Sequence, residues 1–113
     1  MLETKNTKKY DLEERTFIFA QKCKAFVQGL PKTISNIEYS KQLVRSSGSQ
    51  AANYIEANES LSKKDFVNRA KICRKEAKES RLWIKLIDPD QQELLQEATE
   101  LTKIFNSIVQ KST

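Results

Sequence analysis

The stretch from Ser62 to Ile87 is the feature that most constrains the fold. It contains neither glycine nor proline, and its content of Ala, Lys, Arg, Glu and Leu favours an α-helix. Small or apolar side chains recur through it at alternating spacings of four and three residues: Phe66, Ala70, Cys73, Ala77, Ser80, Ile84 and Ile87. A helix buries such a repeat against neighbouring helices. The stretch therefore predicts a long helix with one side in an all-helical core.

The two flanks of this helix differ in charge. One flank carries a row of cations, here called the basic stripe: Lys64, Lys71, Arg74, Lys78, Arg81 and Lys85. The other mixes charged and large apolar side chains, among them Trp83. Like charges at helical neighbour positions repel by about 0.2–0.5 kcal/mol per pair. The basic stripe therefore indicates either a polyanion-binding surface or a solvated face, and both interpretations stay open.

Three further helices are expected. The first begins at Asp11 and ends at Gly29, which suits a left-handed cap, and Pro31. Its buried positions are Leu12, Thr16, Phe19, Cys23, Phe26 and Leu30. The second begins near Ser35 or Asn36 and reaches about Asn58. Its predicted buried positions are Ile37, Ser40, Val44, Ser47, Ala51 and Tyr54.

Two local signals add detail. Gly48 in the second helix predicts either the close approach of another helix backbone or a local kink, because glycine costs about 1 kcal/mol in a helix. Asp88 and Pro89 predict an N-cap and first position for the fourth helix, and Ser62 caps the third. The fourth helix buries Leu94, Ala98, Leu101, Phe105 and Ile108.

Together these patterns predict an all-α protein, an antiparallel up-down-up-down four-helix bundle over residues 11–113, preceded by a flexible basic tail over residues 1–10. At 113 residues the chain suits one domain. It has no apolar run long enough for a membrane span and no apolar core of a signal peptide, so a cytoplasmic location is expected. The net charge of +5 permits a polyanionic partner, and Lys5, Lys8 and Lys9 would add to the basic stripe.

The residues present argue against catalysis. The chain has no histidine, which removes the commonest general base and metal ligand, and no glycine-rich phosphate loop. Glu76 and Glu79 share one face, but carboxylates flanked by Arg and Lys are usually structural ion pairs. Cys23 and Cys73 fall on buried positions and are expected to be reduced thiols, with a disulfide or a metal pair as the alternative. We predict no enzymatic activity, no cofactor and no metal.

Several apolar side chains lie off the buried positions. Phe17 and Ile18 point away from the core side of the first helix, and such surface is unusual on a small monomer. We therefore predict a homo-oligomer whose interface comprises Phe17, Ile18, Ile72, Glu76, Glu79, Trp83 and Leu86. Trp83 is buried either in the core or against a second protomer. The two glutamates are expected to pair with a cation such as Arg45 or Lys75, within or between protomers.

Three blocks carry a resemblance: DLEERTFIFA from Asp11, QLVRSSGSQAANYIEA from Gln42 and DFVNRAKICRKEAKESRLWIKLI from Asp65. In these the chain resembles the bacterial four helix bundle protein family, also called 23S rRNA intervening-sequence proteins. That family includes the accessory variability determinant proteins of diversity-generating retroelements. The resemblance covers nearly the whole chain. The matching positions are Arg45, Ser49, Lys75, Glu76, Glu79 and Trp83.

The resemblance implies a small basic bundle. By analogy with the retroelement members it implies a homopentamer that associates with a reverse transcriptase and nucleic acid. The leading hypothesis is a non-enzymatic homo-oligomer that binds nucleic acid, RNA in particular, through the basic stripe. The alternative is a scaffold, encoded by an rRNA intervening sequence, that contacts only proteins and uses its positive charge for solubility.

Overall fold

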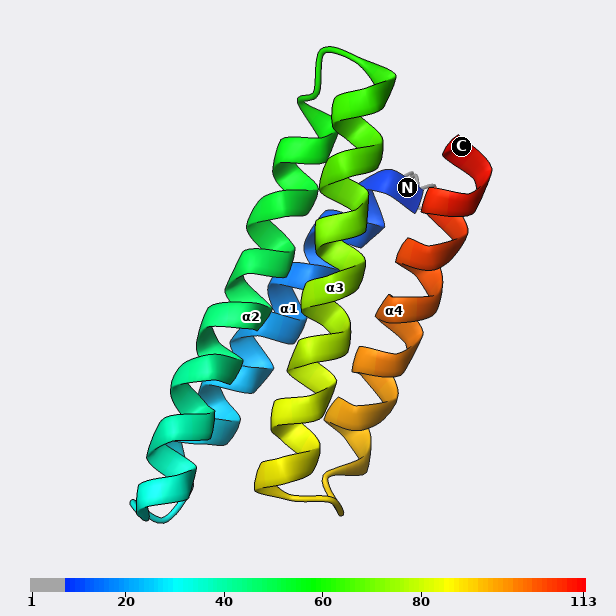
Figure 1. Ribbon diagram of the computed structural model, residues 1–113. Coiled ribbons are helices and arrows are strands. Elements are labelled where there is room, and N and C mark those ends of the chain that lie inside the picture. Colours follow the sequence, from blue (N-terminus) through cyan, green and yellow to red (C-terminus); the bar gives the residue numbers. More distant parts are fainter. Residues whose placement is uncertain (1–7) are drawn as a thin grey trace, which may run out of the picture.

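The computed structural model describes residues 8–113, with side chains from residue 12 onward. It contains α1 (Lys8–Gln28), α2 (Ile34–Asn58), α3 (Lys63–Ile87) and α4 (Gln92–Ser112). Successive helices run antiparallel, and α1 begins at the end of the bundle where α4 finishes (Figure 1). The predicted all-α four-helix bundle is confirmed. Lys5 lies outside the described residues, and the side chains of Lys8 and Lys9 are not among those described.

The core is built from the predicted positions of α1, α3 and α4. Phe19, Ile84 and Phe105 are almost completely buried, together with the small Ala77 of α3. Tyr54 of α2 meets Phe105 edge to face, with ring centroids 5.6 Å apart. These contacts place the core side of α3 inward and therefore turn its opposite side to solvent.

The predicted buried positions of α2 are partly wrong. Ile37 and Val44 are 40% and 48% exposed, whereas the buried side chains are Leu43, Ser46, Ser47, Gln50, Tyr54 and Ala57. Small serines let α3 approach closely, and the hydroxyls of Ser46 and Ser80 lie 2.7 Å apart in the buried interface. Packing against α3 thus sets the rotation of α2 and leaves part of its apolar surface outside.

The ends of α1 and α4 differ from prediction. Gly29 does not have a positive φ, so the left-handed cap is wrong. Instead the Gly29 amide donates to the Phe26 carbonyl at 3.2 Å, which tightens the last turn. Asp88 caps the C-terminus of α3, and its side chain accepts the Asp90 amide at 3.0 Å. The N-cap of α4 is Gln91, three residues after the predicted Asp88, so Pro89 is not the first residue of the helix.

Two other local predictions have opposite outcomes. Ser62 caps α3 as expected, because its hydroxyl accepts the Asp65 amide at 3.1 Å. Gly48 lies inside the unbroken helix α2, and no atom comes within 4 Å of the place where a Cβ would stand. The close helix approach predicted at Gly48 is therefore absent within this chain. Across the four described helices, no segment is both long and apolar enough to cross a membrane.

Candidate nucleic-acid interface

The basic stripe lies along the solvent side of α3. Lys64, Lys71, Lys78 and Lys85 are exposed and recur every seven residues, which places them about 10.5 Å apart along the helix axis. The row therefore extends for about 32 Å. Among the described residues, no acid forms an ion pair with any of these lysines.

The two arginines of the basic stripe lean toward α4. The Arg74 Nη1 donates to the Asn106 Oδ1 at 2.8 Å, and the Arg81 Nε donates to the Thr99 Oγ1 at 2.9 Å. Both acceptors are neutral, so these bonds orient the guanidinium groups without cancelling their charge. Each guanidinium has five N–H donors, and the remaining donors can reach an anion.

One further cation belongs to this surface. Lys75 is exposed and lies four residues after Lys71 and three before Lys78, which places it on the same side of α3. The prediction missed it because only one flank of the helix was considered. Leu82 is also exposed here and interrupts the row between Lys78 and Lys85.

The surface offers no aromatic platform. Among the described residues, Phe17 of α1 is the one aromatic side chain that is largely exposed, and it is not part of α3. Base stacking on aromatic rings is the usual means by which proteins hold single-stranded nucleic acid. The arrangement instead suits contacts with phosphates, which carry charge but no sequence information.

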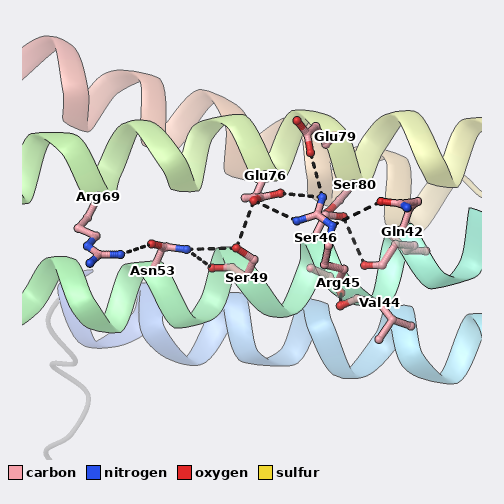
Figure 2. Close-up of polar contacts among 12 residues, drawn as sticks. Gln42, Val44, Arg45, Ser46, Ser49, Asn53, Arg69, Glu76, Glu79 and Ser80 are labelled. Atoms are coloured by element: carbon pink, nitrogen blue, oxygen red, sulfur yellow. Dashed lines mark hydrogen bonds and ion pairs between the residues drawn. The ribbon is translucent and has the colours of Figure 1, made fainter.

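A network of polar contacts joins α2 to α3 beside this surface (Figure 2). Glu76 is only 5% exposed, and Arg45 donates to both of its carboxylate oxygens at 3.3 Å. Arg45 also donates to Glu79 at 3.1 Å. The hydrogen bonds that Arg45 donates to Glu76 raise the pKa of Arg45 and outweigh the loss of solvation, so the guanidinium stays charged. The predicted pairing of the two glutamates with Arg45 is confirmed within one chain.

The network continues along the helices toward the loop between α2 and α3. Ser49 donates to Glu76 at 3.2 Å, and the Asn53 side chain donates to the Ser49 hydroxyl at 3.1 Å. Arg69 closes the series by donating to the Asn53 Oδ1 at 2.8 Å (Figure 2). The roles of Asn53 and Arg69 were not predicted, because polar residues on a helix surface carry no periodic signal. The network holds α3 in the orientation that turns the lysines outward.

The predicted interface residues lie in three different settings. Phe17, Ile18 and Leu86 are exposed. Ile72 and Trp83 are partly buried, and Trp83 packs on the core with its ring 5.8 Å from that of Tyr39. Glu76 and Glu79 belong to the polar network. The structure therefore does not gather the seven residues into one patch, and three of them present apolar surface to solvent.

The cysteines are inert in this setting. Cys23 and Cys73 are free and fully buried, and burial raises the pKa of each thiol to about 12. A thiol with so high a pKa is protonated at neutral pH and is a poor nucleophile. Over the described part of the chain, no three His, Cys, Asp or Glu side chains are grouped to hold a metal ion.

Comparison with known proteins places the chain in a family. Among proteins with curated descriptions, none matches the sequence. A crystal structure of a protein of unknown function from the S23 ribosomal protein family of Bacteroides thetaiotaomicron is similar, with a TM-score of 0.79 and 26% sequence identity. The similarity covers 92% of this chain and 99% of that chain. The model of the 23S rRNA-intervening sequence protein family matches residues 8–109, and the chain therefore belongs to that family.

Proposed function

We propose that this protein is a non-enzymatic homo-oligomer that binds RNA through the basic stripe of α3. The observation that carries the proposal is the row of six cations on one helix, none of which forms an ion pair with an acid of the described chain. A row of cations that pairs with no acid of the described residues favours an external polyanion. The name of the family adds a link to ribosomal RNA genes, and it does not by itself assign an activity.

Binding of this kind is dominated by phosphate contacts. The lysines are spaced along a straight helix, and the two arginines are held in place by Asn106 and Thr99. Without an aromatic platform among the described residues of the stripe, recognition tolerates different base sequences. Affinity then depends steeply on salt, because each neutralised phosphate contributes roughly 0.7–0.9 to the log–log slope.

Self-association would strengthen such binding, since several stripes on one particle act together. The exposed apolar side chains Phe17, Ile18 and Leu86 support assembly. A pentamer, and a reverse transcriptase as the protein partner, follow from the resemblance to the retroelement members of the family. We therefore include the pentamer and the reverse transcriptase partner in the proposal.

A double charge reversal tests the RNA site. Lys71→Glu combined with Lys78→Glu changes two exposed side chains and the net charge by −4. The matched control, Lys24→Glu combined with Lys111→Glu, makes the same charge change at exposed positions on α1 and α4. Binding of a fluorescent single-stranded RNA and of a duplex RNA is titrated between 50 and 300 mM salt (about the range in which such contacts weaken).

The stripe variant should lose most of its affinity and lower the salt slope by roughly 1.4–1.8, whereas the control keeps the slope of the parent. Circular dichroism checks that both variants retain their helices. Equal losses in the two variants would mean that only net charge matters, and full binding by the stripe variant would rule out the site. Either result would reject the basic stripe as the RNA site, and a parent that binds no RNA at low salt would favour the scaffold that contacts only proteins.

A further inference from the structure

A second line of cations lies beside the lysines of the basic stripe, at the edge where α3 meets α4. The guanidinium groups of Arg74 and Arg81 are held against α4 by Asn106 and Thr99. Lys103 is exposed on α4, four residues after Thr99 and three before Asn106, so it lies between the two arginine contacts. Arg74, Lys103 and Arg81 therefore follow one another along this edge, and we call them the α4 line.

The α4 line runs parallel to the exposed lysines of α3. The two arginine contacts fix how far α4 is shifted along α3, and they place Lys103 at about the level of Lys78. The axes of two packed helices are typically about 8–10 Å apart. The molecule thus presents two lines of cations side by side on a rigid pair of helices (Figure 1).

The acids of the two helices lie away from both lines. Those of α3 lie toward α2, where two of them pair with Arg45 and the third lines a hollow with α2 residues. Those of α4 lie toward α1, where two of them pair with Arg15 and Lys22 and the third follows on the same side. Among the described residues, no acid forms an ion pair with Lys103. The acids are Asp65, Glu76 and Glu79 on α3 and Glu93, Glu97 and Glu100 on α4.

We propose that the two lines together bind double-stranded RNA, with one line on each of its phosphate backbones. A duplex offers two lines of phosphates at a fixed separation, whereas a single strand offers one. The minor groove of A-form RNA is wide and shallow, so a flat pair of helices can contact the phosphates and 2′-hydroxyls along both of its edges. This inference rests on the RNA binding proposed above and specifies the form of the RNA.

The cost of ordering the ligand favours the same choice. Stacking of bases on aromatic rings is what usually holds a flexible single strand, and Phe17 of α1 is the one largely exposed aromatic side chain of the described residues. A duplex is already ordered and therefore loses less conformational freedom on a rigid surface. Arg74 and Arg81 lose little freedom as well, because Asn106 and Thr99 already hold them.

Fluorescence anisotropy with three probes tests this assignment. The probes are a duplex RNA of about 20 base pairs, which exceeds the roughly 16 that double-stranded RNA-binding domains span, one of its strands alone, and the DNA duplex of the same sequence. The strand is chosen so that it does not pair with itself, and affinities are compared per phosphate. The duplex RNA should bind about tenfold or more tightly than the strand, and more tightly than the DNA duplex.

Two variants test the α4 line itself. Lys103→Gln removes its lysine, and Lys24→Gln is the matched control at an exposed position of α1. The Lys103 variant should lower the salt slope for duplex RNA by roughly 0.7–0.9 and leave single-strand binding unchanged, whereas the control should change neither. Asn106→Ala keeps every charge but frees the Arg74 side chain, so it should weaken duplex binding without changing the salt slope. Circular dichroism checks that each variant keeps its helices.

Four results would overturn the assignment. Equal affinities for the duplex and the single strand would reject the duplex, and the RNA site itself would stand if Lys71→Glu with Lys78→Glu still abolished both. A Lys103 variant that behaves like the Lys24 variant would exclude α4 from the site. A DNA duplex bound as tightly as the RNA duplex would show that A-form geometry is not recognised. A parent that binds none of the probes at low salt would reject RNA binding as well.

Discussion

At the scale of single residues, Gln50 is the most unusual member of the core. Its side chain is completely buried, and neither its Oε1 nor its Nε2 has a hydrogen-bond partner among the described residues. A buried polar group without a partner costs about 1–3 kcal/mol. Gln50→Met keeps the unbranched shape and removes the polar atoms, so the free energy of unfolding should rise by roughly this amount. Urea denaturation measures it.

A smaller side chain is the control for this substitution. Gln50→Ala also removes the amide but leaves a cavity, so it should be less stable than the methionine variant by about 2 kcal/mol or more. A methionine variant that is less stable than the parent would show that the amide has a favourable role in the core. In that case the buried glutamine stabilises the fold and does not strain it.

The sequence predicted which residues lie on the solvent side of α3, but it did not predict which residues of α4 they contact. The lysines of the basic stripe were predicted from spacing alone, because a heptad repeat keeps residues on one side of a helix. The contacts of Arg74 and Arg81 with Asn106 and Thr99 depend on how α4 lies against α3. No pattern within one helix contains that information.

At the scale of elements, α2 shows why periodicity is a limited guide. Its large apolar residues are more often exposed than buried, and small serines fill the interface with α3. The sequence therefore favoured the face of Ile37 and Val44, whereas close packing between Ser46 and Ser80 selects a neighbouring face. In α4 four of the five predicted positions are buried, whereas Ile108 is only partly buried and Val109 beside it is buried instead.

The polar network between α2 and α3 can be tested at its two ends. Arg45→Met leaves the buried carboxylate of Glu76 without its cation, and hydrogen bonds to charged groups contribute about 1.5–3 kcal/mol. Arg69→Met removes a single exposed bond and leaves only the neutral Asn53 without this partner, so it should cost only about 0.5–1.5 kcal/mol. Urea unfolding of the two variants compares them directly. Equal losses would show that Glu76 does not depend on Arg45.

At the scale of the whole molecule, the four helices are not held equally. α3 packs between α2 and α4, whereas α1 lies at the side of the bundle and is linked to α4 in part by the pairs of Arg15 with Glu97 and Lys22 with Glu93. The Lys22 pair is exposed, so solvent and salt screen it and it contributes little to stability. Amide hydrogen exchange should be faster in α1 than in the middle of α3, and 0.5 M salt should increase the difference (the Debye length is then only about 4 Å). Identical rates in both helices would contradict this order.

The overall arrangement of the helices was easier to predict from the sequence than the contacts of single residues. Four long amphipathic segments with short links leave few alternatives to an antiparallel bundle, and the chain adopts it. The candidate surface followed from the same reasoning, because a helix with one buried side must expose the opposite one. A surface between subunits could not be predicted in this way, because a single sequence does not show which exposed apolar side chains contact a second copy.

The neutral partners of Arg74 and Arg81 have a consequence for control of the protein. Neither Asn106 nor Thr99 titrates, and the chain contains no histidine, the side chain whose ordinary titration falls between pH 5 and 8. No histidine is therefore present to change the charge of this surface between pH 5 and 8. The fraction of basic stripes that carry RNA would instead depend on ionic strength and on competing polyanions such as other RNAs. For the RNA binding proposed above, the salt concentration is therefore the expected means of control.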